Sequence, residues 1–220
     1  TPDLVNVSTL ADSEDTTSPY TDDVLLDELI FGTTVYDGTT GSLSVARRLE
    51  VTAGRGQINA EFGDNDTGDD LDPNPFVKAG IVGAGDPVPM STQESTDPAI
   101  QDAALLNAFN SRSVSEITDG EGRAFSSFKV LFENSLAFDD VGGDALPDIM
   151  FLERGLNDEF DVSLITGGTF ESPVLSNPVT IDSGDFFETE IEINTVEIGG
   201  AQALGVGGFD LSAFGLGAGD

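Results

Sequence analysis

An acidic stretch between residues 63 and 73 holds the side chains of this sequence best suited to bind a metal ion. Its five aspartates are Asp64, Asp66, Asp69, Asp70 and Asp72. Gly68 permits the sharp turn that would bring their carboxylates together. Ca²⁺ takes about six to eight oxygen ligands, which such a loop can supply, although Pro75 stands where a complete EF-hand has its glutamate. The spacing predicts a calcium site, and the alternative is a solvated acidic loop in a protein that is acidic throughout.

A second acidic group follows later in the chain. Its candidate ligands are Asp139, Asp140 and Asp144, with Asp148 close behind them. The glycines at 142 and 143 let the backbone fold so that carboxylates and carbonyls turn inward. These residues predict a second site for the calcium cofactor, and the alternative is an acidic loop between two strands.

Composition argues against the common catalytic arrangements. The chain has no Cys and no His, so neither a Ser-His-Asp triad nor a zinc site of the usual kinds can form. A pair of carboxylates, as in glycosidases, is compatible with 41 acidic residues. However, no Trp and only 2 Tyr are present to stack against a sugar. We therefore expect a protein that is not an enzyme, and a carboxylate-based hydrolase is the last alternative.

The net charge restricts the partners of the chain. It is −33, from 8 Lys and Arg against 41 Asp and Glu. Such a field repels nucleic acid and anionic membranes, and no run approaches the roughly 18 apolar residues of a membrane span. Self-repulsion on this scale predicts that cations stabilise the fold. The start at Thr1 is expected of a mature, secreted chain after removal of a signal peptide.

The elements that must position these loops are mainly strands. The predicted strands are residues 25–35, 42–52, 76–82, 125–132, 149–152, 160–165 and 189–198. One helix is predicted from Pro98, with Asp97 as its cap and with Ile100, Leu105 and Phe109 near one face. The pattern predicts an all-β fold, a β-sandwich of jelly-roll type with one short helix. Residues 24–220 are expected to form this domain, which ends in a Gly-rich strand.

Two of the strand regions carry definite predictions. Residues 149–152 and 160–165 are predicted to pair as a hairpin across a polar segment. Within 189–198, Ile191 and Ile193 should face the core and the glutamates between them should face solvent, because successive side chains of a strand alternate.

The N-terminal arm, residues 1–23, is polar and acidic apart from a short apolar stretch. Such a segment gains little from burial, so we expect it to be ordered only where another surface offers a sheet edge. Leu4, Val5 and Val7 are the candidate interaction residues, because this stretch is long enough to pair as a short strand. The edge can belong to the same domain or to a neighbouring subunit, and we expect the arm to make contacts outside its own domain.

Residues 127–168 resemble a segment of secreted bacterial surface proteins, the β-rich ectodomains of PEP-CTERM-type (exosortase-sorted) and similar proteins. Their pattern is an apolar strand, a Gly/Asp-rich loop, a P-D-[ILV]-x-x-[FL]-E segment and an alternating strand. The matching residues are Pro147, Asp148, Ile149, Leu152, Glu153 and Phe160. Residues 189–216 are similar to the closing strands of the same proteins. The resemblance covers about the second half of the chain and implies a secreted β-sandwich with a structural or adhesive role and no catalytic residues.

The expected function is that of a non-catalytic extracellular structural protein. As a subunit of the cell surface or matrix, it would assemble with copies of itself into a homo-oligomer or polymer by strand addition, stabilised by calcium. The alternative is a calcium-dependent binding module for a polysaccharide or a protein partner. The scarcity of Trp and Tyr counts against a sugar.

Overall fold

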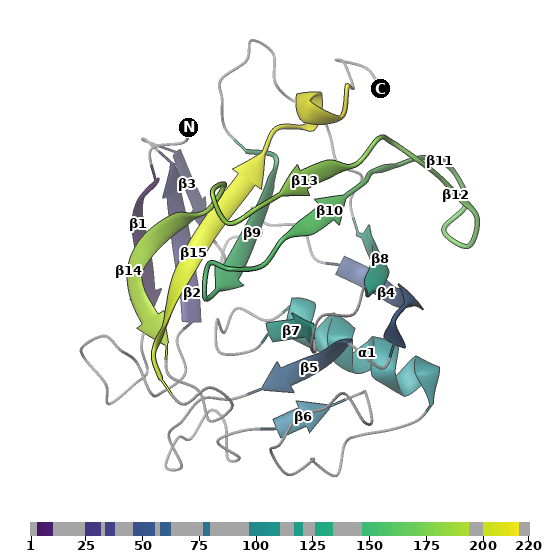
Figure 1. The fold of residues 1–220 in the computed structure, drawn as a ribbon, viewed down its shortest axis with the longest axis horizontal. Coiled ribbons are helices and arrows are strands. Elements are labelled where there is room, and N and C mark those ends of the chain that lie inside the picture. The colour runs from purple at the N-terminus through teal and green to yellow at the C-terminus, as the bar shows by residue number, and fades with distance from the viewer. Residues whose placement is uncertain are drawn as a thin grey trace.

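The all-β class predicted from the sequence is confirmed. The computed structural model describes residues 4–10, 25–31, 34–37, 46–55, 58–62, 77–79, 97–110, 117–120, 126–133, 147–193 and 200–215. Within these ranges the regular structure consists of short antiparallel strands, one α-helix and a short 3₁₀ helix, Leu211–Phe214 (Figure 1). The strands form sheets of two or three members each, an arrangement that does not establish the jelly-roll order.

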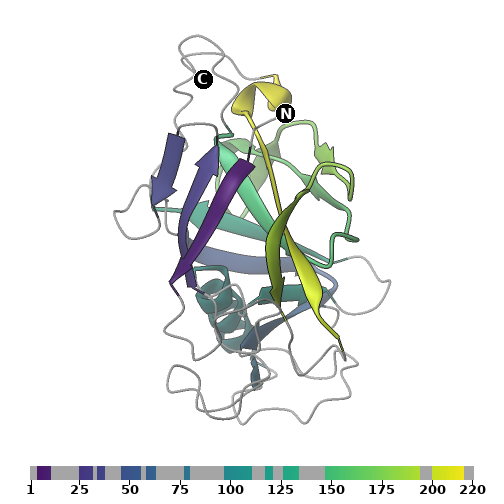
Figure 2. The ribbon, with the colours of Figure 1, turned by 90° about the vertical axis from the view of Figure 1, so that its left-hand side faces the viewer.

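The apolar stretch of the N-terminal arm forms the first strand of a three-stranded sheet. Strand β1 (Leu4–Leu10) pairs antiparallel with β2 (Leu25–Phe31), which pairs in turn with β3 (Thr34–Asp37). On its other side, β1 contacts β14 (Phe187–Ile193) of a second sheet (Figure 2). Residues 4–10 are therefore docked on their own chain.

The helix α1 (Pro98–Phe109) begins as predicted, but its buried face differs from the prediction. Asp97 Oδ1 accepts a hydrogen bond from the Ala99 amide at 2.9 Å, with Pro98 in the first turn. Leu105 is fully buried, whereas Ile100 is 50% exposed and Phe109 is also exposed. Five residues rotate a helix by about 140° beyond a full turn, so Ile100 and Leu105 lie on different faces. The buried residues are Gln101, Leu105 and Ala108, at the three- and four-residue spacing of one face.

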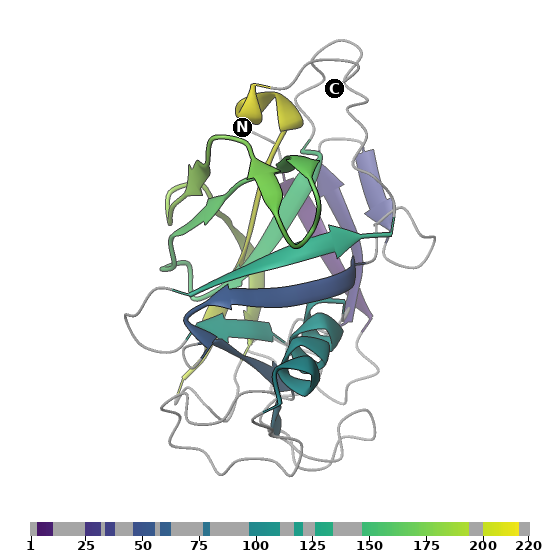
Figure 3. The same ribbon diagram turned by 90° about the vertical axis from the view of Figure 1, so that its right-hand side faces the viewer.

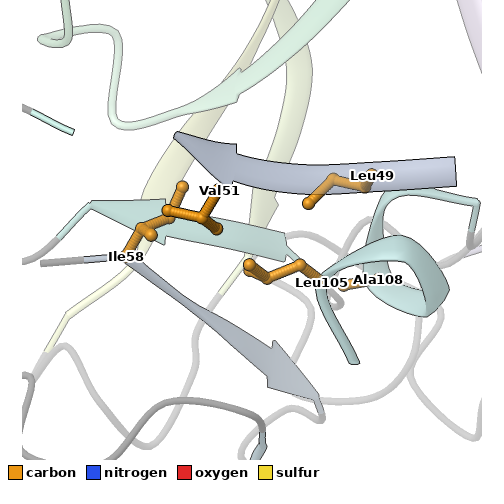
Figure 4. Packing of buried hydrophobic residues seen from close by; sticks show 5 residues of the cluster. All are labelled: Leu49, Val51, Ile58, Leu105 and Ala108. Atoms are coloured by element: carbon orange, nitrogen blue, oxygen red, sulfur yellow. The ribbon is translucent and has the colours of Figure 1, made fainter. Parts of the chain in front are cut away.

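This buried face packs against strands from two neighbouring sheets. One sheet pairs β4 (Ala46–Ala53) with β8 (Ser127–Phe132). The other places β5 (Ile58–Phe62) between β6 (Val77–Ala79) and β7 (Ile117–Gly120). Their common core contains Leu49, Val51, Ile58, Leu105 and Ala108 (Figure 4). Burial of these apolar side chains fixes the helix across both sheets.

Polar contacts at both ends of β4 orient the helix. Asn110, which ends α1, accepts a hydrogen bond from the Ala46 amide at 2.9 Å and donates one to the Ala46 carbonyl at 2.7 Å. Near the other end, Arg55 Nη1 lies 2.7 Å from Asp102 Oδ1, which also accepts from the Val51 amide at 3.2 Å. One of the few basic side chains of the chain is thus engaged in a structural ion pair.

The C-terminal sheet has the order β14-β15-β9, with β15 (Gln202–Phe209) in the centre and β9 (Ile149–Arg154) at one side. The alternation predicted for β14 is confirmed, because Ile191 and Ile193 are buried while Glu188 and Glu192 are exposed. The predicted Gly-rich final strand is β15 itself. Its four central residues, Leu204 to Gly207, are all buried.

The glycines of β15 provide space for neighbouring side chains. A Cβ on Gly207 would lie 3.1 Å from the Phe186 ring, and one on Gly208 would lie 2.7 Å from Pro147 Cβ. Phe186 also lies 3.2 Å from the position of a Cβ on Gly205. A glycine in a strand interior often marks such a close approach, so the composition of this segment is explained by packing.

The predicted hairpin between residues 149–152 and 160–165 is wrong, because β9 pairs with β15 instead. After β9 the chain leaves the sheet and forms a separate two-stranded ribbon, residues 160–181 (Figure 1). In this ribbon β10 (Phe160–Val162) pairs with β13 (Val179–Ile181), and β11 (Ile165–Gly168) pairs with β12 (Pro173–Leu175). The turn before the ribbon has positive φ angles at Gly155 (110°) and Leu156 (57°), which redirect the chain.

Candidate functional site

The predicted calcium ligands lie outside the described residues. This applies to the group from Asp64 to Asp72 and to the group from Asp139 to Asp144. Within the described ranges, no group of three or more His, Cys, Asp or Glu side chains is arranged to hold a metal ion. Asp148, next to the second group, accepts a hydrogen bond through Oδ2 from the amide of Leu211, the first residue of the 3₁₀ helix, at 2.9 Å. Calcium binding stays a prediction.

The candidate interaction residues Leu4, Val5 and Val7 are part of β1. Leu4 is in register with Phe31 and Val7 with Leu29, while Val5 falls at a register shift. The expected contact outside the domain is not found for these residues, because β1 pairs with β2 of the same chain. Deletion of residues 1–10 would remove a strand from this sheet, so a truncation cannot serve as a clean test of assembly.

The ribbon, residues 160–181, presents apolar side chains and an unpaired strand edge to solvent. Ile165, Val174 and Leu175 are 39%, 59% and 54% exposed, and every residue of β11 is exposed. Among the described strands, β11 pairs only with β12, which leaves its other edge open. Pro173 removes one backbone hydrogen-bond donor from β12. A further strand can therefore pair more completely with the open edge of β11 than with that of β12.

The same segment is almost uncharged. Residues 162–181 contain a single charged side chain, Glu171, although 22% of the whole chain is charged. Arg48 Nη1 lies 2.8 Å from Glu171 Oε1, so this charge is paired. In a chain of net charge −33, the ribbon is a place where two molecules could approach without bringing carboxylates face to face.

Basic side chains of the β4–β8 sheet hold the tip of the ribbon. Lys129 Nζ donates to the Phe170 carbonyl at 2.7 Å, and its ammonium lies 4.6 Å from the centre of the Phe170 ring. The Arg48 guanidinium lies 4.2 Å from the same ring. Glu50 joins the two bases, 3.1 Å from Arg48 and 3.2 Å from Lys129. We call Arg48, Glu50, Lys129, Phe170 and Glu171 the clamp, which brings the ribbon tip to β8 (Figure 3).

The contact between Arg48 and Glu171 of the clamp favours the charged form of both side chains. The hydrogen bond from Arg48 lowers the pKa of Glu171, and the same contact raises the pKa of Arg48. Both side chains are solvent-exposed, so this pair orients the tip and adds little stability. Lys129, whose side chain is 14% exposed, is the better-protected member of the clamp.

We expect Lys129→Met to lower the free energy of unfolding by about 1–2 kcal/mol, because it removes a charged hydrogen bond and a cation–π contact. Urea denaturation followed by circular dichroism measures this change. Arg47→Met, at an exposed position of the same sheet, is the matched control. Equal loss in the two variants would show that general charge, and not the clamp, is responsible.

The residues of the resemblance have structural contacts in and around the C-terminal sheet. Pro147 packs on Gly208, Ile149 and Leu152 belong to β9, and the Phe160 ring lies 5.0 Å from that of Phe151. Packing accounts for Pro147 and Phe160, whereas Leu152 is 40% exposed and is not explained in this way. The exposed ribbon edge, in contrast, was missed by reasoning from the sequence, although the long run with one charge was a signal for it.

Comparison of the chain with protein-family models, with curated proteins and with solved structures found no match. The resemblance to secreted surface proteins therefore stays a prediction. In the described part of the chain, no helix has the length and apolar character required to cross a membrane.

Proposed function

We propose that this protein is a non-catalytic structural domain, exported from the cell, that assembles with copies of itself through the ribbon. The observation that carries the proposal is the open edge of β11 in a nearly uncharged, apolar segment of a chain with net charge −33. A strand edge adds a partner through main-chain hydrogen bonds, which tolerate almost any side chain. Ile165, Val174 and Leu175 would supply the apolar contact.

A second copy of the chain is the occupant that fits this edge best. Two copies of β11 can pair antiparallel about a twofold axis, because such an interface uses the same surface on both molecules. The clamp favours this pairing, since it holds the ribbon in one orientation before a partner arrives and so reduces the entropy lost on association. Cations, calcium among them, would screen the carboxylates on the rest of the surface.

The proposal predicts reversible association of the purified protein that depends on the ribbon. Sedimentation velocity over a range of concentrations, with sodium and calcium salts at matched ionic strength, measures it. We expect Ile165→Asp to weaken association at least about tenfold, because Ile165 lies on β11 and the twofold pairing would bring two like charges into the interface. Ser183→Asp adds the same charge at an exposed position outside the ribbon strands and should leave association unchanged.

Three results are informative. A wild-type protein that stays monomeric at every concentration, or two variants that associate equally well, would contradict assembly through the ribbon. Association in calcium alone, with sodium ineffective, would support assembly that depends on the predicted calcium sites and not on charge screening. Circular dichroism of both variants confirms that the substitutions leave the fold intact.

A further inference from the structure

Glu153, near the end of β9, is a buried carboxyl group that is only partly compensated. The residue is 8% exposed, and neither carboxylate oxygen forms a hydrogen bond of good geometry with a described residue, although the backbone amides of residues 156–158 lie close to it. Burial of an ionised carboxylate without compensation costs far more than burial of the neutral acid. The neutral acid also carries an O–H donor, which the carboxylate lacks. The environment of Glu153 therefore favours the protonated form.

The turn that follows Glu153 is strained and is held against β15, where the Gly155 amide donates a hydrogen bond to the Ala203 carbonyl at 2.9 Å. Gly155 and Leu156 both have positive φ angles, a conformation that is unfavourable for leucine. The Leu156 side chain occupies the space where a Cβ on Gly205 would lie, which closes the turn over β15. Gln202 also reaches this turn, with Nε2 3.0 Å from the position of a Cβ on Gly155, and its Oε1 is another buried oxygen without a partner.

We propose that Glu153 is a proton-operated latch for the turn at residues 154–158, from which the chain enters the ribbon. The neutral acid is compatible with the closed turn. The amides of residues 156–158 compensate an ionised Glu153 only in part, and opening of the turn admits water that completes the solvation of the carboxylate. Because β10 begins at Phe160, directly after this turn, ionisation would loosen the root of the ribbon. The inference does not rest on the proposed assembly.

The charged groups around Glu153 agree with this assignment. Burial raises the pKa of Glu153, Asp158 adds to the rise, and the backbone amides of residues 156–158 oppose it. Across the sheet, Glu188 is in register with Gly205, which is in register with Glu153, so a second acidic residue lies on the same row. Arg154 is the next residue along β9 and therefore projects toward the opposite face.

A proton suits this site better than a metal ion. No cluster of three or more His, Cys, Asp or Glu side chains is present among the described residues, so Glu153 lacks the additional carboxylates of a typical calcium site. The amides of residues 156–158 that act on Glu153 present partial positive charge, which repels a cation.

The direction of the pH dependence follows from the raised pKa. Below the pKa of an unfolded glutamate, about 4.3, both the folded and unfolded states are protonated and Glu153 has no effect. As the pH rises above that value, the folded state retains its proton longer, so stability falls. The loss is complete above the folded pKa and persists at higher pH.

Glu153→Gln tests the latch, since glutamine keeps the shape of the neutral acid and cannot ionise. We expect the variant to melt at a higher temperature than wild type at about pH 7.5 and at nearly the same temperature at about pH 3.5. Overall charge affects the melting temperatures of the two proteins almost equally at each pH. Its effect therefore largely cancels in the difference between the two melting temperatures. Glu159→Gln, at an exposed position nearby, should show no such growth of the difference with pH.

Amide hydrogen exchange locates the effect. At about pH 7.5, the amides of residues 154–162 should exchange faster in wild type than in Glu153→Gln, and those of β14 equally in both. Carbon-13 NMR titration of the wild-type carboxyl groups should show one glutamate with a raised midpoint, which keeps the test valid if the variant does not fold. A difference in melting temperature that is independent of pH, a stabilisation by calcium that is lost in Glu153→Gln, or an unshifted Glu153 midpoint would overturn the proposal.

Discussion

Leu105→Ala is expected to lower the free energy of unfolding by about 2–5 kcal/mol, because it leaves a cavity in the core between α1 and the two sheets that the helix covers. Leu105 has no solvent exposure and packs with Leu49, Val51, Ile58 and Ala108. Chemical denaturation measures the change. The loss should appear as a lower denaturant midpoint with an unchanged slope.

Ile100→Ala on the same helix is the control for this substitution. Ile100 is exposed, so its truncation removes little buried surface, and alanine has a higher helix propensity than isoleucine. Its effect should stay within about 0.5 kcal/mol. Similar losses for the two variants would mean that the helix does not present Leu105 to the core.

Gly208→Val is expected to destabilise the C-terminal sheet by up to about 3 kcal/mol through overpacking. A Cβ at this position would lie 2.7 Å from Pro147 Cβ and 2.9 Å from the Ile149 carbonyl oxygen, and a backbone oxygen cannot move without distorting β9. Valine itself favours strands, so intrinsic preference would act in the opposite direction. Thermal denaturation measures the net effect.

Gly200→Val is the matched control, since no atom of the described residues, apart from those of its chain neighbours, lies within 4 Å of a Cβ at that position. It should change the melting temperature by little. If Gly208→Val were as stable as wild type, the close contact of Pro147 with β15 would be excluded as the reason for glycine at this position.

Local features of the structure were predictable from short stretches of sequence. The start of α1 depends on Asp97 and Pro98, whose capping geometry involves neighbouring residues only. The inward side of β14 follows from the alternation of isoleucine and glutamate. The buried face of α1 was less predictable, because apolar type alone did not reveal that Ile100 projects away from the sheets.

Strand pairing was beyond the reach of the same reasoning. Residues 149–152 and 160–165 are close in the chain and suited to a hairpin, yet β9 pairs with β15, about fifty residues later in the sequence. The positive φ angles at Gly155 and Leu156 send the chain out of the sheet. The glycines of β15 leave room for Phe186 and Leu156 to pack over this strand.

The sequence by itself determined the acidic character, the all-β class, the single helix in the described part and the absence of the Cys and His used in catalytic triads and common zinc sites. These properties depend on composition and on contacts between near neighbours. Only the tertiary structure decided that β1 is paired within the chain, that β11 has an edge unpaired by any described strand and that Glu153 is buried with little compensation from described residues. Exposure and pairing of a side chain depend on segments that are distant in sequence, and many such arrangements are compatible with the same local pattern.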